Sequence, residues 1–331
     1  MSEIITQDEV GLSDIQEYRA HVRGWGRAAR DCRQQGDIGG EAKALLNLGW
    51  AQEALGDGAK GIESVKRSRL LFESVGESAA VADCSHNLAV WTFHHSEDRP
   101  AAVEYFSDAA HRREALGDPL LAAKSWHNQA YVEMIYGEAK TSRRSYARAD
   151  ELLDKATTGD VSPNSAAFAE RQRGFVYSHL ALWEARYGSV STAAEAIEAY
   201  FAHVLRTGAH REPVIVYVAG GVTAGRLDGR VDARVASLAA TAGVSPPTRD
   251  GWLHRALEVS DASLRHHQMG QRRGYLGAHL LALAELAASS ELERRPSKAD
   301  DYVARGLALA RARGWEGEEA RLRRRFLHRV S

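Results

Sequence analysis

Cysteine is scarce in this chain of 331 residues, and the two that are present form no recognisable framework. Neither Cys32 nor Cys84 belongs to a CxxC motif or to a Cys/His pair at the spacing of zinc ligands. The sequence therefore predicts neither a disulfide framework nor a structural zinc site. Unpaired thiols fit a reducing compartment, and we expect a cytoplasmic protein.

The chain also lacks an excess of charge and any long apolar run. Lysine plus arginine total 43 against 44 for aspartate plus glutamate, which gives a net charge of −1. Because polyanion binding needs a basic face, we predict no direct nucleic-acid partner. The longest run of apolar residues and glycines, 214–222, is too short to span a bilayer, and the N-terminus has no signal pattern. We predict no membrane partner either.

Motifs of cofactor binding and catalysis are missing as well. The sequence contains no dinucleotide-binding GxGxxG after a strand, no P-loop, no HExxH, no GxSxG and no EF-hand loop. The segment AGGVTAGRLDG, residues 219–229, lacks the glycine spacing of a phosphate-binding loop and is interpreted as a turn or a helix-packing segment. We therefore predict no cofactor.

What the sequence does contain is a repeat of about forty residues. Asn47, Asn87 and Asn128 occupy equivalent places in similar segments, at steps of 40 and 41 residues. A fourth copy, residues 177–197, carries His179 in the asparagine position and follows an insertion. Repeats of this length are typical of solenoids built from short helical units.

Each copy is interpreted as two helices, because a turn signal occurs at two places in it. The first helices are expected to end at Gly56, Ser96, Gly137 and Gly188. Gly36, Gly76, Gly117 and Gly159 mark the ends of the second helices and of the helix before the first copy. A two-helix unit cannot bury its apolar face alone, so the units stack. The predicted fold is all-α, an α-solenoid of antiparallel helix pairs.

These features resemble tetratricopeptide repeats. In the first copy, the resemblance is carried by Leu45, Asn47, Leu48, Gly49, Gly56 and Gly61, with small residues where two helices approach closely. The length of the repeat is similar to that of the extended repeats in bacterial signalling ATPases and antibiotic regulators. The resemblance implies a right-handed superhelix and a free-standing bacterial sensor or scaffold, for example in specialised metabolism.

The repeats define the expected organisation of the chain. Residues 1–12 form an N-terminal tail, and residues 13–207 form the TPR-like array. Residues 208–331 contain further helix pairs that either continue the solenoid or pack back on its groove. About fourteen to sixteen helices are expected in all, with almost no strand. Residues 214–218 are the exception, since a β-branched run is also typical of a strand.

The resemblance further implies that defined positions of each first helix line a concave groove. These positions are Lys43, Leu46, Trp50, Glu53, Asp83, His86, Asn87, Val90, Phe93, His94, Lys124, His127, Asn128, Tyr131, Met134, Phe175, Ser178 and Leu182. Aromatic rings provide contact area and histidines titrate near neutral pH, so an apolar peptide or a flat small molecule would suit the groove. Alternatively, Trp50, Phe93 and Tyr131 fill the core between repeats.

One variant of the family clamps a C-terminal carboxylate with lysine and asparagine at fixed groove positions. Here only Asn87 and Lys124 match that pattern. Leu46, Trp50 and Asn128 depart from it. We therefore do not expect a clamp of that kind.

The segment HNLAVWTFHHSED, residues 86–98, invites a metal-site interpretation. His86 and His94 lie eight residues apart on one helix face, and a third ligand would have to come from His127 or Asp83. We predict no metal, because the repeat register already explains most of the segment. His95 falls where the helix ends, and the residues left unexplained by the scaffold are His86, Phe93 and His94.

Two hypotheses of function follow, and a third is kept open. The first is a non-catalytic protein that binds a peptide, a protein partner or a small apolar or aromatic signalling molecule; a homodimer is also open. The second is an enzyme or a ligand-binding accessory protein of bacterial specialised metabolism. Its acid/base candidates are His86, His94, His127 and Asp83, in a pocket made by Trp50, Phe93 and Tyr131. The third is regulation of transcription through a partner.

Overall fold

The computed structural model describes residues 12–158, 162–208, 214–227, 232–266 and 273–326. Fifteen α-helices and no strand lie in these ranges, which confirms the predicted all-α class. No helix among them is long and apolar enough to cross a bilayer. The chain divides into two compact units, Met1–Val132 with Leu307–Ser331, and Glu133–Gly306.

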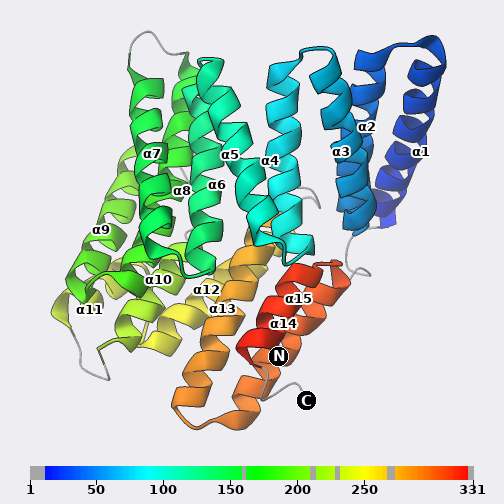
Figure 1. The fold of residues 1–331 in the computed structure, drawn as a ribbon. Helices are drawn as coiled ribbons and strands as arrows, with labels where there is room; N and C mark the ends of the chain where they lie inside the picture. Colours follow the sequence, from blue (N-terminus) through cyan, green and yellow to red (C-terminus); the bar gives the residue numbers. More distant parts are fainter. Residues whose placement is uncertain (1–11, 159–161, 209–213, 228–231, 267–272, 327–331) are drawn as a thin grey trace. The chain divides into compact units, whose positions relative to one another are not determined.

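The first unit contains the leading helices and the last one. They are α1 (Leu12–Gln35), α2 (Ile38–Ala54), α3 (Gly58–Ser74), α4 (Ser78–His95), α5 (Arg99–Ala115), most of α6 (Pro119–Ile135), and α15 (Glu316–Arg325). Helices α1 to α5 each pack on the next helix along the chain, as expected for stacked helix pairs. Figure 1 shows these helices running alternately up and down.

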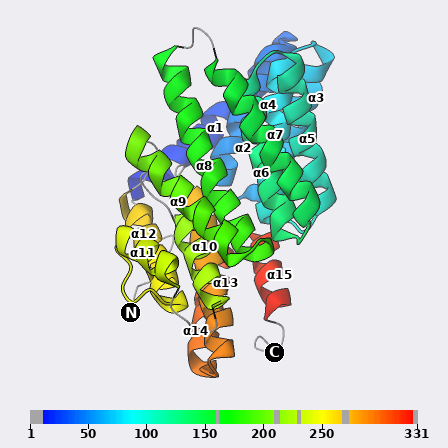
Figure 2. The same cartoon turned by 90° about the vertical axis from the view of Figure 1, so that its left-hand side faces the viewer.

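The second unit holds the middle of the chain. It contains α7 (Ala139–Thr157), α8 (Pro163–Tyr187), α9 (Val190–Thr207), α10 (Val214–Gly225), α11 (Ala233–Thr241), α12 (Arg249–His266), α13 (Arg273–Leu292) and part of α14 (Pro296–Ala312). Here α10 packs on α8, α9, α12 and α13, and Figure 2 shows α8, α9 and α10 close together.

Residues 214–218 belong to helix α10, so the strand alternative is wrong. Packing accounts for the outcome. A Cβ atom on Gly220 would lie 2.4 Å from the Trp252 ring, and one on Gly221 would lie 2.7 Å from Leu253 Cγ. The close packing of α12 side chains against these two glycines overrides the strand propensity of a β-branched run.

Glycines end the repeat helices where the sequence predicted. Gly36, Gly56, Gly76, Gly117 and Gly137 all have positive φ, between 72° and 85°. A residue with a Cβ atom is strained in that left-handed conformation, which is why glycine commonly follows a helix end. The end expected at Gly159 lies outside the described residues.

Small residues bring α2 and α3 into backbone contact. A Cβ atom on Gly49 would lie 2.6 Å from Val65 Cγ2 and 2.9 Å from the carbonyl oxygen of Gly61. Around this crossing, the core of the first unit includes Val65, Leu88 and the fully buried Trp91. The packing reason given for the small residues of the repeat is therefore confirmed in the first copy.

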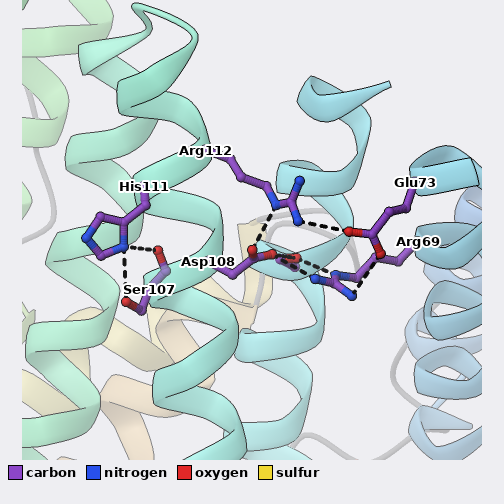
Figure 3. A network of polar contacts seen from close by, with 7 residues as sticks. Arg69, Glu73, Ser107, Asp108, His111 and Arg112 are labelled. Atoms are coloured by element: carbon purple, nitrogen blue, oxygen red, sulfur yellow. Dashed lines mark hydrogen bonds and ion pairs between the residues drawn. The ribbon is translucent and has the colours of Figure 1, made fainter. Parts of the chain in front are cut away.

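Polar contacts also follow the repeat. Arg69 Nη2 lies 3.1 Å from Asp108 Oδ2, and Arg112 Nη2 lies 3.0 Å from Glu73 Oε1 (Figure 3). Both pairs join α3 to α5, which are the second helices of neighbouring copies, and both have a sequence separation of 39 residues. Arg112 Nε also binds Asp108 Oδ1 at 2.8 Å, so the four side chains form one network.

Candidate functional site

The residues predicted to line a groove differ in exposure. Lys43, Trp50 and Asp83 are exposed. The half-buried positions are Leu46, His86, Asn87, Val90, His94, Lys124, Asn128, Tyr131 and Phe175. The buried positions are Glu53, Phe93, His127, Met134, Ser178 and Leu182. Met134, Phe175, Ser178 and Leu182 belong to the second unit. We call the surface formed by Lys43, Trp50, Asp83, His86, Asn87, Lys124, Asn128 and Tyr131 the first-helix face of unit 1.

Trp50 is the most prominent aromatic residue of this face. It keeps 41% of its surface exposed, although its ring packs edge-on against the buried Trp91 with ring centroids 5.5 Å apart. Phe93 is buried instead, with Tyr131 edge-on to it at 5.9 Å. Of the two alternatives for the aromatic residues, Trp50 is exposed to solvent, and core filling fits Phe93.

His86, on α4, contacts side chains of both α5 and α6. Its Nδ1 lies 2.9 Å from Ser125 Oγ, its Nε2 lies 3.4 Å from Asn128 Nδ2, and its ring is edge-on to Phe106. Burial, together with the nearby charges of Lys124 and Arg113, lowers its pKa to about 3. The ring is therefore neutral near pH 7, with Nδ1–H donating to Ser125 and Nε2 accepting from Asn128.

Charged residues next to His86 have partners of their own. Arg113 forms an ion pair with Asp83, and its other nitrogen lies 3.5 Å from Asp118 Oδ2. Burial lowers the pKa of Lys124, while Asp83 acts in the opposite direction. Asp83 is thus engaged with Arg113 and does not contact an imidazole as a catalytic base would.

His94 is covered by the C-terminal helix. Its ring stacks on Trp315 with centroids 4.3 Å apart and planes at 19°, and its Nδ1 lies 3.1 Å from Glu318 Oε1. Burial lowers the pKa of His94, although Glu318 works to raise it. Burial works to raise the pKa of Glu318, but Arg321 and His94 together bring it down to about 2. The carboxylate is ionised near pH 7.

Arg321 completes the contact between α15 and α4. Its guanidinium lies 4.1 Å from the centroid of the Phe93 ring, a cation–π distance. Its Nη2 donates to the carbonyl oxygen of Phe93 at 2.8 Å and lies 2.7 Å from Glu318 Oε1. Because that carbonyl is in the last turn of α4, a cation there also interacts favourably with the helix dipole.

His95 contacts the turn before α15. Its Nδ1–H donates to the carbonyl oxygen of Gly314 at 2.7 Å, and its Nε2 lies 3.5 Å from Glu53 Oε1. Its ring lies against Gly58, where a Cβ atom would be 2.2 Å from His95 Cε1. Two adjacent histidines on α4 therefore both bind the C-terminal segment.

The four acid/base candidates do not come together. His86 pairs with Ser125, His94 with Glu318 and Asp83 with Arg113, while His127 is buried in α6. Within the described ranges, no group of three or more histidine, cysteine or acidic side chains is arranged to hold a metal ion. The hypothesis of an acid/base pocket gains no support from this arrangement.

Sequence reasoning missed three residues that cover α4, which are Glu318 and Arg321 of α15 and Trp315 directly before it. Trp315, Glu318 and Arg321 are spaced three apart, which places them on one face of a helix. That spacing is typical of residues on one face of a helix. It did not indicate which helix the face would contact, because His94 and Glu318 are separated by 224 residues.

Comparisons with known proteins bear on the fold. No protein-family model matches the chain, and no curated protein matches it. The solved structure of BtubC (BKLC) from P. vanneervenii is similar, with 14% identity and a TM-score of 0.51, over 76% of this chain and 93% of BtubC. A circular tandem repeat protein with novel repeat topology matches 93% of this chain and 88% of its own at 14% identity, but its TM-score is 0.28. With the stacked helices described above, the likeness to BtubC shows that this chain has an all-α, helical-repeat fold.

Proposed function

We propose that the chain is a TPR-like, non-catalytic interaction scaffold that binds a peptide segment of a partner protein on the first-helix face of unit 1. The observation that carries this proposal is the exposed ring of Trp50, which is held in place by Trp91. A large aromatic side chain that is already ordered loses little conformational freedom on binding, and such residues dominate binding energies at interfaces.

The surroundings of Trp50 suggest the chemistry of the partner. Lys43 is exposed and lies seven residues earlier on α2, so both side chains project from the same helix face two turns apart. A segment that places an apolar side chain against Trp50 and a carboxylate near Lys43 would complement this face. We also propose that the protein works in the cytoplasm, because its thiols Cys32 and Cys84 are free, as is usual in a reducing compartment.

The alternative of an enzyme or a ligand-binding accessory protein has weaker support. Its candidate residues are dispersed and engaged with separate partners, and His86 with a pKa of about 3 is a poor general base near pH 7.

The test uses peptides selected from a displayed library on the purified full-length protein. Dissociation constants would be measured by fluorescence anisotropy for the native chain and for Trp50→Ala. We expect at least about a tenfold loss of affinity, which corresponds to about 1.4 kcal/mol. Trp25→Ala is the matched control, because Trp25 is 37% exposed but lies on α1. Equal effects of the two substitutions, or selection of no peptide at all, would contradict the proposal.

A further inference from the structure

The C-terminal helix α15 lies on α4 through side chains of one face. Trp315 contacts the ring of His94, Glu318 contacts its Nδ1, and Arg321 contacts the ring and the carbonyl oxygen of Phe93. An aromatic ring, a carboxylate and a guanidinium thus follow one another at intervals of three residues. Figure 1 shows α15 beside the C-terminal end of α4. The first unit therefore already holds one helical segment in a defined place.

The backbones also approach closely where α15 begins. A Cβ atom on Gly317 would lie 2.2 Å from the carbonyl oxygen of Ser96 and 3.0 Å from that of His94. A Cβ atom on Gly314 would lie 2.8 Å from the carbonyl oxygen of Gly56. All three obstacles are backbone atoms, which cannot rotate away as a side chain could. The docked position of α15 therefore requires glycine at both places.

The segment around α15 is held by the buried side chains of Trp315, Leu322 and Phe326 and, at α4, by polar contacts of Glu318 and Arg321. Glu318 is a buried carboxylate that depends on His94 and Arg321, and a buried ion pair of this kind adds little net stability while it defines one geometry. The helix has 10 residues, too few to be stable in isolation. The polar contacts to α4 therefore define the position in which the helix lies.

We propose that α15 is an internal occupant of a docking site on the C-terminal end of α4, and that a partner helix binds there by displacing it. The partner helix carries an aromatic residue, a carboxylate three residues later and an arginine three residues after that. The inference rests on the proposed function, because it assigns a second partner contact to the same unit. The site on α4 consists of Phe93, His94 and His95.

The experiment asks whether the site accepts the same helix from solution. A fluorescein-labelled peptide of residues 314–326 is titrated into the native chain and into Gly317→Ala. In Gly317→Ala the alanine favours the helix itself but clashes with the carbonyl oxygen of Ser96, so α15 still forms and no longer docks. The labelled peptide keeps Gly317 and can therefore dock in its place. We expect it to bind the variant at least about tenfold more tightly than the native chain, whose own α15 occupies the site.

Gly24→Ala is the matched control. Gly24 lies inside α1 and is exposed, and a Cβ atom there would meet nothing within 4 Å. We expect the peptide to bind this variant as weakly as it binds the native chain. Adding His94→Ala to Gly317→Ala should remove the tight binding. Equal affinity for the native chain and Gly317→Ala, or tight binding that survives His94→Ala, would overturn the proposal.

A second variant covers the case in which Gly317→Ala does not fold. Glu318→Gln keeps the shape of the side chain and removes its charge. In hydrogen exchange we expect amides 316–325 to exchange at least about tenfold faster, while those of α2 and α3 keep their native rates. Unchanged exchange in α15 would overturn the proposal. The affinity of the selected peptides for Trp50→Ala tests the proposed function alone. The proposed function and the docking site on α4 can therefore fail independently of each other.

Discussion

At Gly49 and Gly61 a missing side chain decides how two helices pack. Each glycine would place a Cβ atom 2.9 Å from the carbonyl oxygen of the other. Such an oxygen is fixed within its helix, so the strain of an added methyl group would be relieved only by moving α2 from α3. The residue type at these positions thus sets the distance between the helices of a pair.

Substitution at this crossing should lower stability. For Gly49→Ala we expect the free energy of unfolding to fall by about 1–3 kcal/mol, because the methyl group overpacks against Val65 and the Gly61 carbonyl. Urea denaturation followed by circular dichroism measures the change. Gly24→Ala should instead stabilise its helix by about 0.5–1 kcal/mol, since the added Cβ atom has open space. A free energy of unfolding that rises in Gly49→Ala, as it should in Gly24→Ala, would show that the crossing is not tight.

At the scale of the element, α4 combines scaffold and contact functions. Trp91 on α4 is buried in the core, while His86 faces α5 and α6 and the pair His94 and His95 faces α15. Burial lowers the pKa of all three histidines from the ordinary value of 6.5. One helix therefore carries three histidines whose protonation is opposed by their burial.

The sign of the effect of pH on stability follows from the direction of the shifts. A histidine whose pKa is lower in the folded state binds protons more readily when unfolded, so stability is complete above about pH 6.5 and falls below it. For His86, with a folded pKa of about 3, we expect a loss of about 2 kcal/mol by about pH 5. Urea denaturation at several pH values measures it. His86→Gln should flatten the profile. A profile that is identical in the native chain and in His86→Gln would refute the assignment.

Most of the elements could be predicted from the sequence, because their signals are local. The glycine turns at Gly56, Gly76 and Gly117 fixed helix ends within a few residues. The packing of α15 on α4 could not be predicted, since no periodicity relates Glu318 to His94. In the same way the exposure of Trp50 and the burial of Phe93 depend on neighbours that local spacing does not specify.

At the scale of the whole molecule, repeats and compact units do not share their boundaries. The predicted TPR-like array runs through residues 13–207, whereas the first compact unit ends at Val132, inside α6, and also includes Leu307–Ser331. Compactness depends on which helices contact one another, and the last helix contacts one of the first. The repeat pattern alone therefore does not predict a compact unit that combines the first and the last part of the chain.

The dispersal of the histidine and acidic side chains leads to a prediction for the whole protein. Protein purified without an affinity tag should contain less than about one-tenth of an equivalent of zinc, nickel or iron, because a stable site needs at least three convergent ligands. In the described residues no such group is present. Elemental analysis after gel filtration measures it. Stoichiometric metal would restore the metal-site interpretation of residues 86–98.

The network of Arg69, Glu73, Asp108 and Arg112 has a consequence for how such a chain changes in evolution. Its partners are separated by 39 residues, one repeat apart. Inserting a single residue in α4 would turn every later side chain by about 100° and misplace both ion pairs at once. Gaining or losing an entire helix pair would instead keep the remaining helix faces in register, because each pair contacts mainly its neighbours. Changes of length by whole repeats are therefore the ones that this architecture tolerates best.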